Sequence, residues 1–235
     1  AGLNLVSKIL KWKKGDIIFC SPITFVSSSN CILHQGAKVV FVDINKKTFN
    51  IDDKILEKLL KKKDIRNRAK AIIATDYAGN PCNWKALKKI SKKNNLILIN
   101  DNCHAIGASY DNKKKYLNKY ADIGVHSYHA VKNITTGEGG SVLTNKKEIF
   151  KKLKLLSSHG IIKNTSQSKP WEYEMLDLGF NFRMTDIQAA LGISQLNKLN
   201  KFVVERTKIA KLYDKHFSKS EFVQTQKVEE KNFSS

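Results

Sequence analysis

The chain has 235 residues, 41% of them hydrophobic and 9% aromatic, which excludes a disordered chain and suffices for one sizeable core and the start of a second domain. No apolar run approaches the roughly 20 residues that a membrane span needs, and no signal peptide is visible, so no membrane partner is expected. The net charge of +21 attracts anions, but the lysines spread along the whole chain without a nucleic-acid-binding motif, so no nucleic-acid partner is expected.

Short apolar runs alternate with longer amphipathic stretches along most of the chain. In chain order the spacing predicts a helix over 2–12, a strand over 16–20, a helix over 24–35, a strand over 38–43, a helix over 51–63 that starts near Asp52 or Asp53, a strand over 69–76, a helix over 84–94, and strands over 96–101, 121–128 and 139–145. This alternation predicts an α/β fold of three layers, with a mainly parallel sheet between helices.

The pattern changes after Gly160. A polar loop over 163–174 precedes LGFNFRMTDIQAALGISQLNKL, in which Thr185 is a plausible N-cap for a helix. A further amphipathic helix is predicted over 201–217, and the polar tail from Ser218 has no fold of its own. We therefore predict a large domain over 1–200 and the beginning of a smaller C-terminal domain over 201–235. Because the chain starts at Ala1 and enters a helix at once, we expect a fragment of a longer protein.

The carboxyl ends of parallel strands meet at one edge of a sheet, and ligands bind there. The polar or aromatic residues that follow the predicted strands are Pro22 to Phe25, Asp76 and Tyr77, Asp101 and His104, and Lys132. We expect them to converge on a single rim.

Lys132 lies in the stretch SYHAVKNITTGEGG, among hydroxyl-bearing residues and just before three glycines. A lysine at the end of a buried strand is placed to attack a carbonyl carbon, and glycines let the backbone approach a flat ring or a phosphate. The plain alternative is a surface lysine in a glycine-rich turn. Asp101, about thirty residues earlier, favours the first interpretation, because pyridoxal phosphate (PLP) needs a carboxylate at its pyridine nitrogen. A capping role in the next turn is the alternative for Asp101.

The four cysteines form no C-x-x-C pair and no metal-like spacing with histidine. Free thiols in a reducing cytoplasm are therefore expected, and no metal site.

LINDNCHAIGASY followed by HSYHAVKNITTGEGG resembles the PLP-dependent sugar aminotransferases called the DegT family, of fold-type I. The similarity continues in SPITFVSSSNCILHQGAKVVFVDI, ATDYAGNPCNWKAL and LGFNFRMTDIQAALGISQLNKLNKF, so it covers nearly the whole chain in one order. Around His129 the chain is most similar to enzymes that aminate C4 of a UDP-linked 4-keto-6-deoxy-N-acetylhexosamine, as in the pseudaminic-acid pathway. The resemblance implies glutamate as the amino donor, for the synthesis of cell-surface glycans.

The resemblance implies roles for individual residues around the cofactor. Lys132 corresponds to the lysine that is linked to the cofactor and moves the proton, and Asp101 to the partner of the pyridine nitrogen. Phe25 corresponds to the aromatic that stacks on the ring, His104 to a residue near the ring face or its phenolic oxygen, and Ser127 to a hydroxyl on the phosphate. A core phenylalanine, a structural histidine and an ordinary strand serine are the plain alternatives.

Further residues correspond to the rest of the family's site. Asn181 matches a residue that the second subunit offers to the phosphate, which implies a homodimer with a shared site. His129 and Arg183 match positions near the nucleotide-sugar diphosphate or the substrate pocket, and Tyr77 matches a wall of that pocket.

One departure concerns the phosphate site. Family members carry a Ser/Gly-Thr-Ala turn at a helix N-terminus, whereas AGLNL at the start of this chain resembles the helix just after that turn. Competing hypotheses are a 3-aminating transaminase, a sugar dehydratase, which Lys132 disfavours because histidine replaces the lysine there, a non-catalytic regulator that senses an amino sugar or PLP, and a basic nucleic-acid binder.

Overall fold

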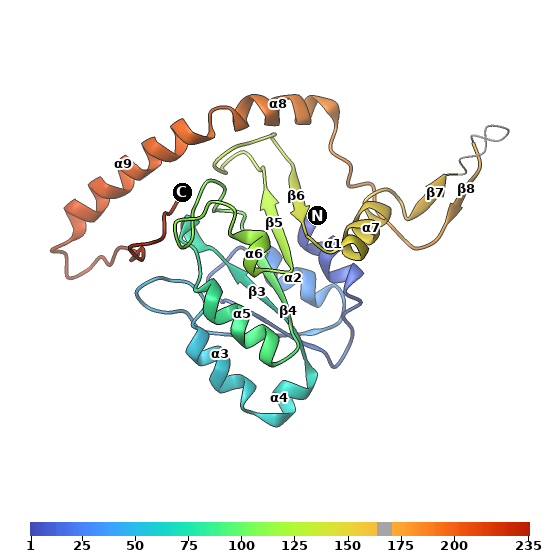
Figure 1. Cartoon of the computed structure of the whole chain (residues 1–235), viewed down its shortest axis with the longest axis horizontal. Coiled ribbons are helices and arrows are strands. Elements are labelled where there is room, and N and C mark those ends of the chain that lie inside the picture. The colour runs from blue at the N-terminus through green and yellow to red at the C-terminus, as the bar shows by residue number, and fades with distance from the viewer. Residues whose placement is uncertain (164–170) are drawn as a thin grey trace.

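A six-stranded, mostly parallel sheet forms the centre of this computed structural model, which describes residues 1–163 and 171–235 (Figure 1). In sheet order the strands are β2 (Lys38–Phe41), β1 (Ile17–Cys20), β3 (Ala69–Thr75), β4 (Ile97–Asp101), β5 (Ile123–Ser127) and β6 (Gly140–Leu143). Only β6 runs antiparallel to its neighbour within this sheet. A separate antiparallel pair joins β7 (Ile161–Lys163) to β8 (Tyr173–Met175). Part of the predicted loop over 163–174 lies outside the described residues.

Helices cover both faces of the sheet, as the alternation predicts (Figure 1). On one face lie α1 (Gly2–Ile9), α2 (Ser27–Leu33) and α7 (Lys147–Leu156). On the other lie α3 (Asp53–Leu60), α5 (Trp84–Lys93) and the short α6 (Leu117–Tyr120). The chain also forms α4 (Lys63–Arg68), the 3-10 turn η1 (Tyr77–Gly79), α8 (Asp186–Leu196) and α9 (Leu199–Phe217).

The central strands are buried on both faces, which explains their continuous apolar runs. In β1, Ile17 and Phe19 join the core under α3 and α5, while Ile18 and Cys20 join the core under α1 and α2. The sheet thus lies between two layers of helices, and the predicted α/β class with three layers is confirmed.

All four cysteines are free thiols, as expected from their spacing.

Local capping explains where several helices begin. The Asp52 carboxylate accepts hydrogen bonds from the backbone of the first turn of α3. Thr185 and Gln188 form a capping box at the start of α8, as the N-cap prediction required. By contrast, α2 begins at Ser27 rather than near Thr24, because the Thr24 hydroxyl bonds to Thr75 and lies in the turn before the helix.

The helices α8 and α9 extend along one side of the molecule (Figure 1). Within them only Val203 is buried, and Ile187 is 84% exposed. Because α9 runs from Leu199 to Phe217, it continues across the predicted boundary at residue 200, and the division into two domains stays a prediction. Within the described ranges, no helix has both the length and the apolar character to cross a bilayer.

Asp76 is the hub of a fully buried polar network directly behind the rim. Its Oδ1 accepts from the backbone N–H of Cys82 at 2.7 Å and from Trp84 Nε1 at 3.0 Å. Its Oδ2 accepts from the Tyr116 hydroxyl at 2.6 Å and from two asparagine side chains, Asn102 at 2.9 Å and Asn100 at 3.2 Å. Burial raises the pKa of the Asp76 carboxyl to about 6, and the hydrogen bonds, led by that from Tyr116, oppose the rise.

We expect Asp76→Asn to lower the free energy of unfolding by about 3 kcal/mol. Both carboxylate oxygens accept from donors, so the NH₂ group of the new amide would face donors whichever oxygen it replaces. Urea unfolding measures the change. Asp52→Asn is the matched control, since asparagine is also a good N-cap, and it should change stability by less than about 0.5 kcal/mol. Equal stability of Asp76→Asn and the unchanged protein would contradict the role given to this network.

Candidate active site

The rim of the site lies where the strand order reverses. Strand β1 lies between β2 and β3, so the connections that leave β1 and β3 diverge at their carboxyl ends. Such a switch point is where open α/β sheets bind ligands. A hydrogen bond of 3.0 Å between the hydroxyls of Thr24 and Thr75 joins the loop after β1 to the end of β3 at this point.

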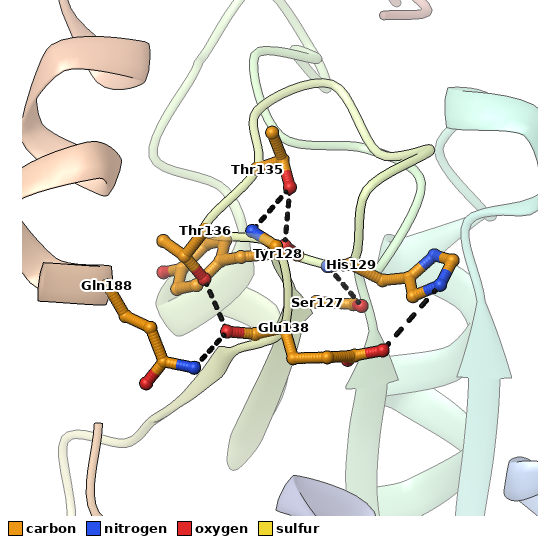
Figure 2. A network of polar contacts seen from close by, with 8 residues as sticks. Ser127, Tyr128, His129, Thr135, Thr136, Glu138 and Gln188 are labelled. Atoms are coloured by element: carbon orange, nitrogen blue, oxygen red, sulfur yellow. Dashed lines mark hydrogen bonds and ion pairs between the residues drawn. The ribbon is translucent and has the colours of Figure 1, made fainter. Parts of the chain in front are cut away.

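The loop that carries Lys132 is closed by a network of polar contacts (Figure 2). The backbone N–H of Tyr128 donates to the carbonyl of Gly139 at 2.8 Å, and that of Thr136 donates to the carbonyl of Tyr128 at 2.9 Å. The carbonyl of Glu138 accepts from the Thr136 hydroxyl at 2.8 Å and from Gln188 Nε2 at 3.0 Å. The ends of the loop are thus fixed to each other and to α8.

A second anchor ties the same loop to the segment after β4. The buried Asn133 side chain donates to the carbonyl of Ile106 at 2.9 Å. It follows directly after Lys132, and Ile106 lies two residues beyond His104. The two segments with the predicted amine and imidazole are therefore held together.

Lys132 and His104 line one cavity of about 240 Å³, whose remaining lining residues are Ala78, Val131, Asn133, Arg206 and Ser235. Burial lowers the pKa of His104, and the nearby Lys132 charge lowers it further, while Asp101 opposes both. The backbone N–H of Ala78 donates to His104 Nδ1 at 3.3 Å, so a neutral ring carries its proton on Nε2. The Tyr77 ring meets the His104 ring edge-on, with 6.0 Å between their centroids.

Asp101 ends β4 as a buried carboxylate, only 3% exposed. Its Oδ2 accepts from the Ser28 hydroxyl at 2.8 Å, and its Oδ1 accepts from the backbone N–H of Cys103 at 3.3 Å. Burial raises the pKa of the Cys103 thiol, Asp101 raises it further, and Lys132 opposes the rise. The charges of Asp101 and Lys132 thus both act on the thiol of Cys103, in opposite directions.

Three other predicted residues, described next, do not line the cavity. Phe25 is 67% exposed in the turn before α2, so it is not a core residue. The half-buried Ser127 accepts at its hydroxyl from the backbone N–H of His129, at 3.3 Å. The exposed His129 Nε2 lies 3.7 Å from Glu138 Oε1 (Figure 2).

Asn181 and Arg183 lie apart from the other predicted residues. Both are exposed, and Asn181 pairs with Ser158 in an isolated β-bridge. Arg183 Nη1 donates to the Ser158 hydroxyl at 3.0 Å. Within this single chain neither residue lines the cavity that contains Lys132.

Sequence reasoning missed Arg206, Asn133 and Ser28 as parts of the site. Arg206 lies on α9, and nothing in the sequence separates it from the many other basic residues of amphipathic helices. Asn133 is adjacent to Lys132, so its position was a usable signal. Ser28 contacts Asp101 across 73 positions of sequence, which no local pattern reveals.

The mostly parallel sheet between helices and the solved structures that match it place the chain in the class of PLP-dependent transferases of fold-type I. The chain belongs to the DegT/DnrJ/EryC1/StrS aminotransferase family, whose model matches residues 1–235. This membership confirms the resemblance found in the sequence.

Individual aminotransferases and solved structures are also similar to this chain. The chain is 41% identical, over 217 residues, to a UDP-4-amino-4,6-dideoxy-N-acetyl-beta-L-altrosamine transaminase of Campylobacter jejuni, covering 92% of this chain and 55% of that protein. The solved structure of Helicobacter pylori PseC, an aminotransferase of pseudaminic acid biosynthesis, matches with a TM-score of 0.82 and 37% identity, covering 93% of this chain and 56% of that one. A sugar aminotransferase of Streptococcus pneumoniae in its PMP form matches with a TM-score of 0.83 and 31% identity, covering 93% and 59%. The chain thus spans about half the length of the relatives that it matches.

Proposed function

We propose that the protein is a PLP-dependent aminotransferase that moves an amino group from glutamate to a nucleotide-linked 4-keto-6-deoxy sugar. The observation that carries this proposal is the shared cavity of Lys132 and His104 beside the buried Asp101 carboxylate. The named transaminases among the relatives support the choice of reaction and of substrate class.

The donor set fits the cofactor group by group. PLP carries an aldehyde, a basic ring nitrogen, a phenolic oxygen and a phosphate, and when bound it supplies a carbonyl for amino groups and a ring that accepts electrons. The amine of Lys132 suits the aldehyde, the carboxylate of Asp101 suits the protonated ring nitrogen, and the Nε2–H of His104 suits the phenolic oxygen. The Ser127 hydroxyl suits the phosphate.

Lys132 would act twice in the reaction. Its Nζ would bind the cofactor aldehyde and, once displaced by the amino donor, would carry the proton between the two reacting carbons. Asp101 would keep the ring nitrogen protonated by offering a negative charge in a site shielded from water. The exposed Phe25 would stack on the ring, where its open face is free to receive it.

The remaining predicted residues would complete the site across two subunits. Asn181 would contact the phosphate in the partner subunit's site, since it is exposed and lies outside the cavity of its own chain. His129 and Arg183 would bind the diphosphate of the nucleotide sugar, and Tyr77 would form a wall of the substrate pocket. Arg206, which lines the cavity, adds a second cation for an anionic substrate.

The proposal is tested by incubating the complete protein with PLP, glutamate and a panel of nucleotide-linked 3-keto and 4-keto sugars. We expect mass spectrometry to show an amino sugar from the UDP-linked 4-keto-6-deoxy-N-acetylhexosamine. Product from the 3-keto sugars alone would make the protein a 3-aminating enzyme. Binding of PLP or of an amino sugar with no product from any sugar would favour a non-catalytic sensor and refute the proposal.

A further inference from the structure

A chain of three hydroxyl groups leads from the end of β3 to Asp101. The Thr75 and Thr24 hydroxyl oxygens are 3.0 Å apart, and those of Thr24 and Ser28 are 3.3 Å apart. The Ser28 hydroxyl lies 2.8 Å from Asp101 Oδ2. Ser28 is fully buried, and Thr75 and Asp101 are each 3% exposed, so water does not compete for most of these contacts.

The carboxylate fixes the direction of every hydrogen bond in this chain. An ionised carboxylate has no proton to give, so Ser28 must donate to Asp101. The Ser28 oxygen is then free to accept from Thr24, and the Thr24 oxygen to accept from Thr75. All three O–H groups therefore point toward the carboxylate, and each polarises the next.

The same chain joins three parts of the fold at the switch point. Thr75 and Asp101 are paired residues on the adjacent parallel strands β3 and β4. Thr24 belongs to the turn after β1, next to Phe25, and Ser28 lies in the first turn of α2. The position of the carboxylate is thus coupled to the turn that presents the aromatic ring.

We propose that Ser28 is a positioning residue for Asp101, holding the carboxylate in the orientation that pairs with the ring nitrogen of the cofactor, with Thr24 and Thr75 holding Ser28 in turn. This inference rests on the proposed function, since it assumes that Asp101 faces PLP. Without the Ser28 hydroxyl, the backbone N–H of Cys103 would still donate to the carboxylate, but only to its Oδ1. The Asp101 side chain could then rotate away from the ring nitrogen.

We expect Ser28→Ala to weaken PLP binding about tenfold, because a hydrogen bond to a charged group is lost. The pH midpoint of the visible absorbance of bound PLP should shift upward, since a ring nitrogen that is less often protonated leaves the lysine-linked nitrogen more basic. Thr24→Val removes the hydrogen bonds of Thr24 to Ser28 and to Thr75 but keeps the one from Ser28 to Asp101, so it should weaken binding about twofold to threefold. The PLP dissociation constant and the absorbance titration, both measured on the complete protein, provide these values.

Ser29→Ala is the matched control, because the Ser29 hydroxyl donates to the carbonyl of Val26 within its own turn, at 2.9 Å. It should bind PLP as the unchanged protein does. The dissociation constant should also be compared for Asp101→Asn with and without Ser28→Ala. If Ser28 acts through Asp101, removing its hydroxyl changes PLP binding much less in the Asp101→Asn background.

The outcomes separate the two proposals. If the unchanged protein binds no PLP, the proposed function fails and this inference fails with it. If the unchanged protein binds PLP but Ser28→Ala leaves both the dissociation constant and the pH midpoint unaltered, the inference alone is overturned. It is also overturned if Ser28→Ala weakens PLP binding equally with Asp101 and with Asn at position 101. Circular dichroism shows whether Ser28→Ala folds. If it does not, Ser28→Cys, which keeps a weak donor, takes its place and must give an intermediate upward shift of the pH midpoint. An unshifted midpoint in Ser28→Cys overturns the inference.

Discussion

Replacing Lys132 with alanine should abolish amino transfer, with a loss of at least about 10³-fold in kcat, together with the visible absorbance of lysine-bound PLP. Lys132 is the amine in the cavity that it shares with His104, and the proposed reaction uses it both to bind the aldehyde and to carry the proton. Absorbance spectra and single-turnover transfer from glutamate measure the two losses separately.

Two further variants show whether the amine or only its charge matters. Lys132→Arg keeps the positive charge but cannot bind an aldehyde, so it should be as inactive as the alanine variant. Lys152→Ala removes an exposed lysine on α7 and should leave turnover unchanged. Turnover by Lys132→Ala at the level of the unchanged protein would disprove the assignment of Lys132.

The second large effect is expected for Asp101→Asn, which should lower kcat by about 10²-fold to 10³-fold. The amide keeps the size of the side chain but removes the negative charge that favours a protonated ring nitrogen. Folding should be less affected than catalysis, because the oxygen of the new amide could still accept from the Ser28 hydroxyl. Steady-state kinetics and urea unfolding of the same samples separate these two effects.

Asp111→Asn is the control for Asp101, because the Asp111 carboxylate lies 3.0 Å from Lys85 in an ion pair outside the cavity lining. It should keep the kcat of the unchanged protein, since a partly exposed ion pair away from the cavity contributes little. A loss in Asp101→Asn no greater than that in Asp111→Asn would show that Asp101 does not serve the cofactor.

Most of the sheet was predictable because its strands are buried on both faces. A strand such as β3, with Ala71 to Thr75 all buried, must be a continuous apolar run, and that pattern is visible without any tertiary information. The boundaries of α2 and α9 were less predictable. Thr24 follows helical spacing but is held in the preceding turn by Thr75, a residue 51 positions away.

Local patterns also gave the two residues on which the proposed site depends most. Lys132 and Asp101 each follow a predicted strand, and the rule for parallel sheets brings their positions to one rim. The roles of Asn181 and Arg183 could not be settled in this way. Both lie outside the cavity of their own chain, and their proposed contacts with a second subunit depend on quaternary structure, which local patterns do not encode.

The sequence by itself determined the layered α/β fold and the family, and it predicted the pair of Lys132 and Asp101, because apolar periodicity and short motifs are local properties of the chain. Only the tertiary structure decided which groups surround that pair. The backbone N–H of Ala78 donates to His104 Nδ1, and the Ser28 hydroxyl, 73 positions away in the sequence, donates to Asp101 Oδ2. Such contacts depend on how strand ends and loops pack against one another at the carboxyl edge of the sheet, which no window of neighbouring residues encodes.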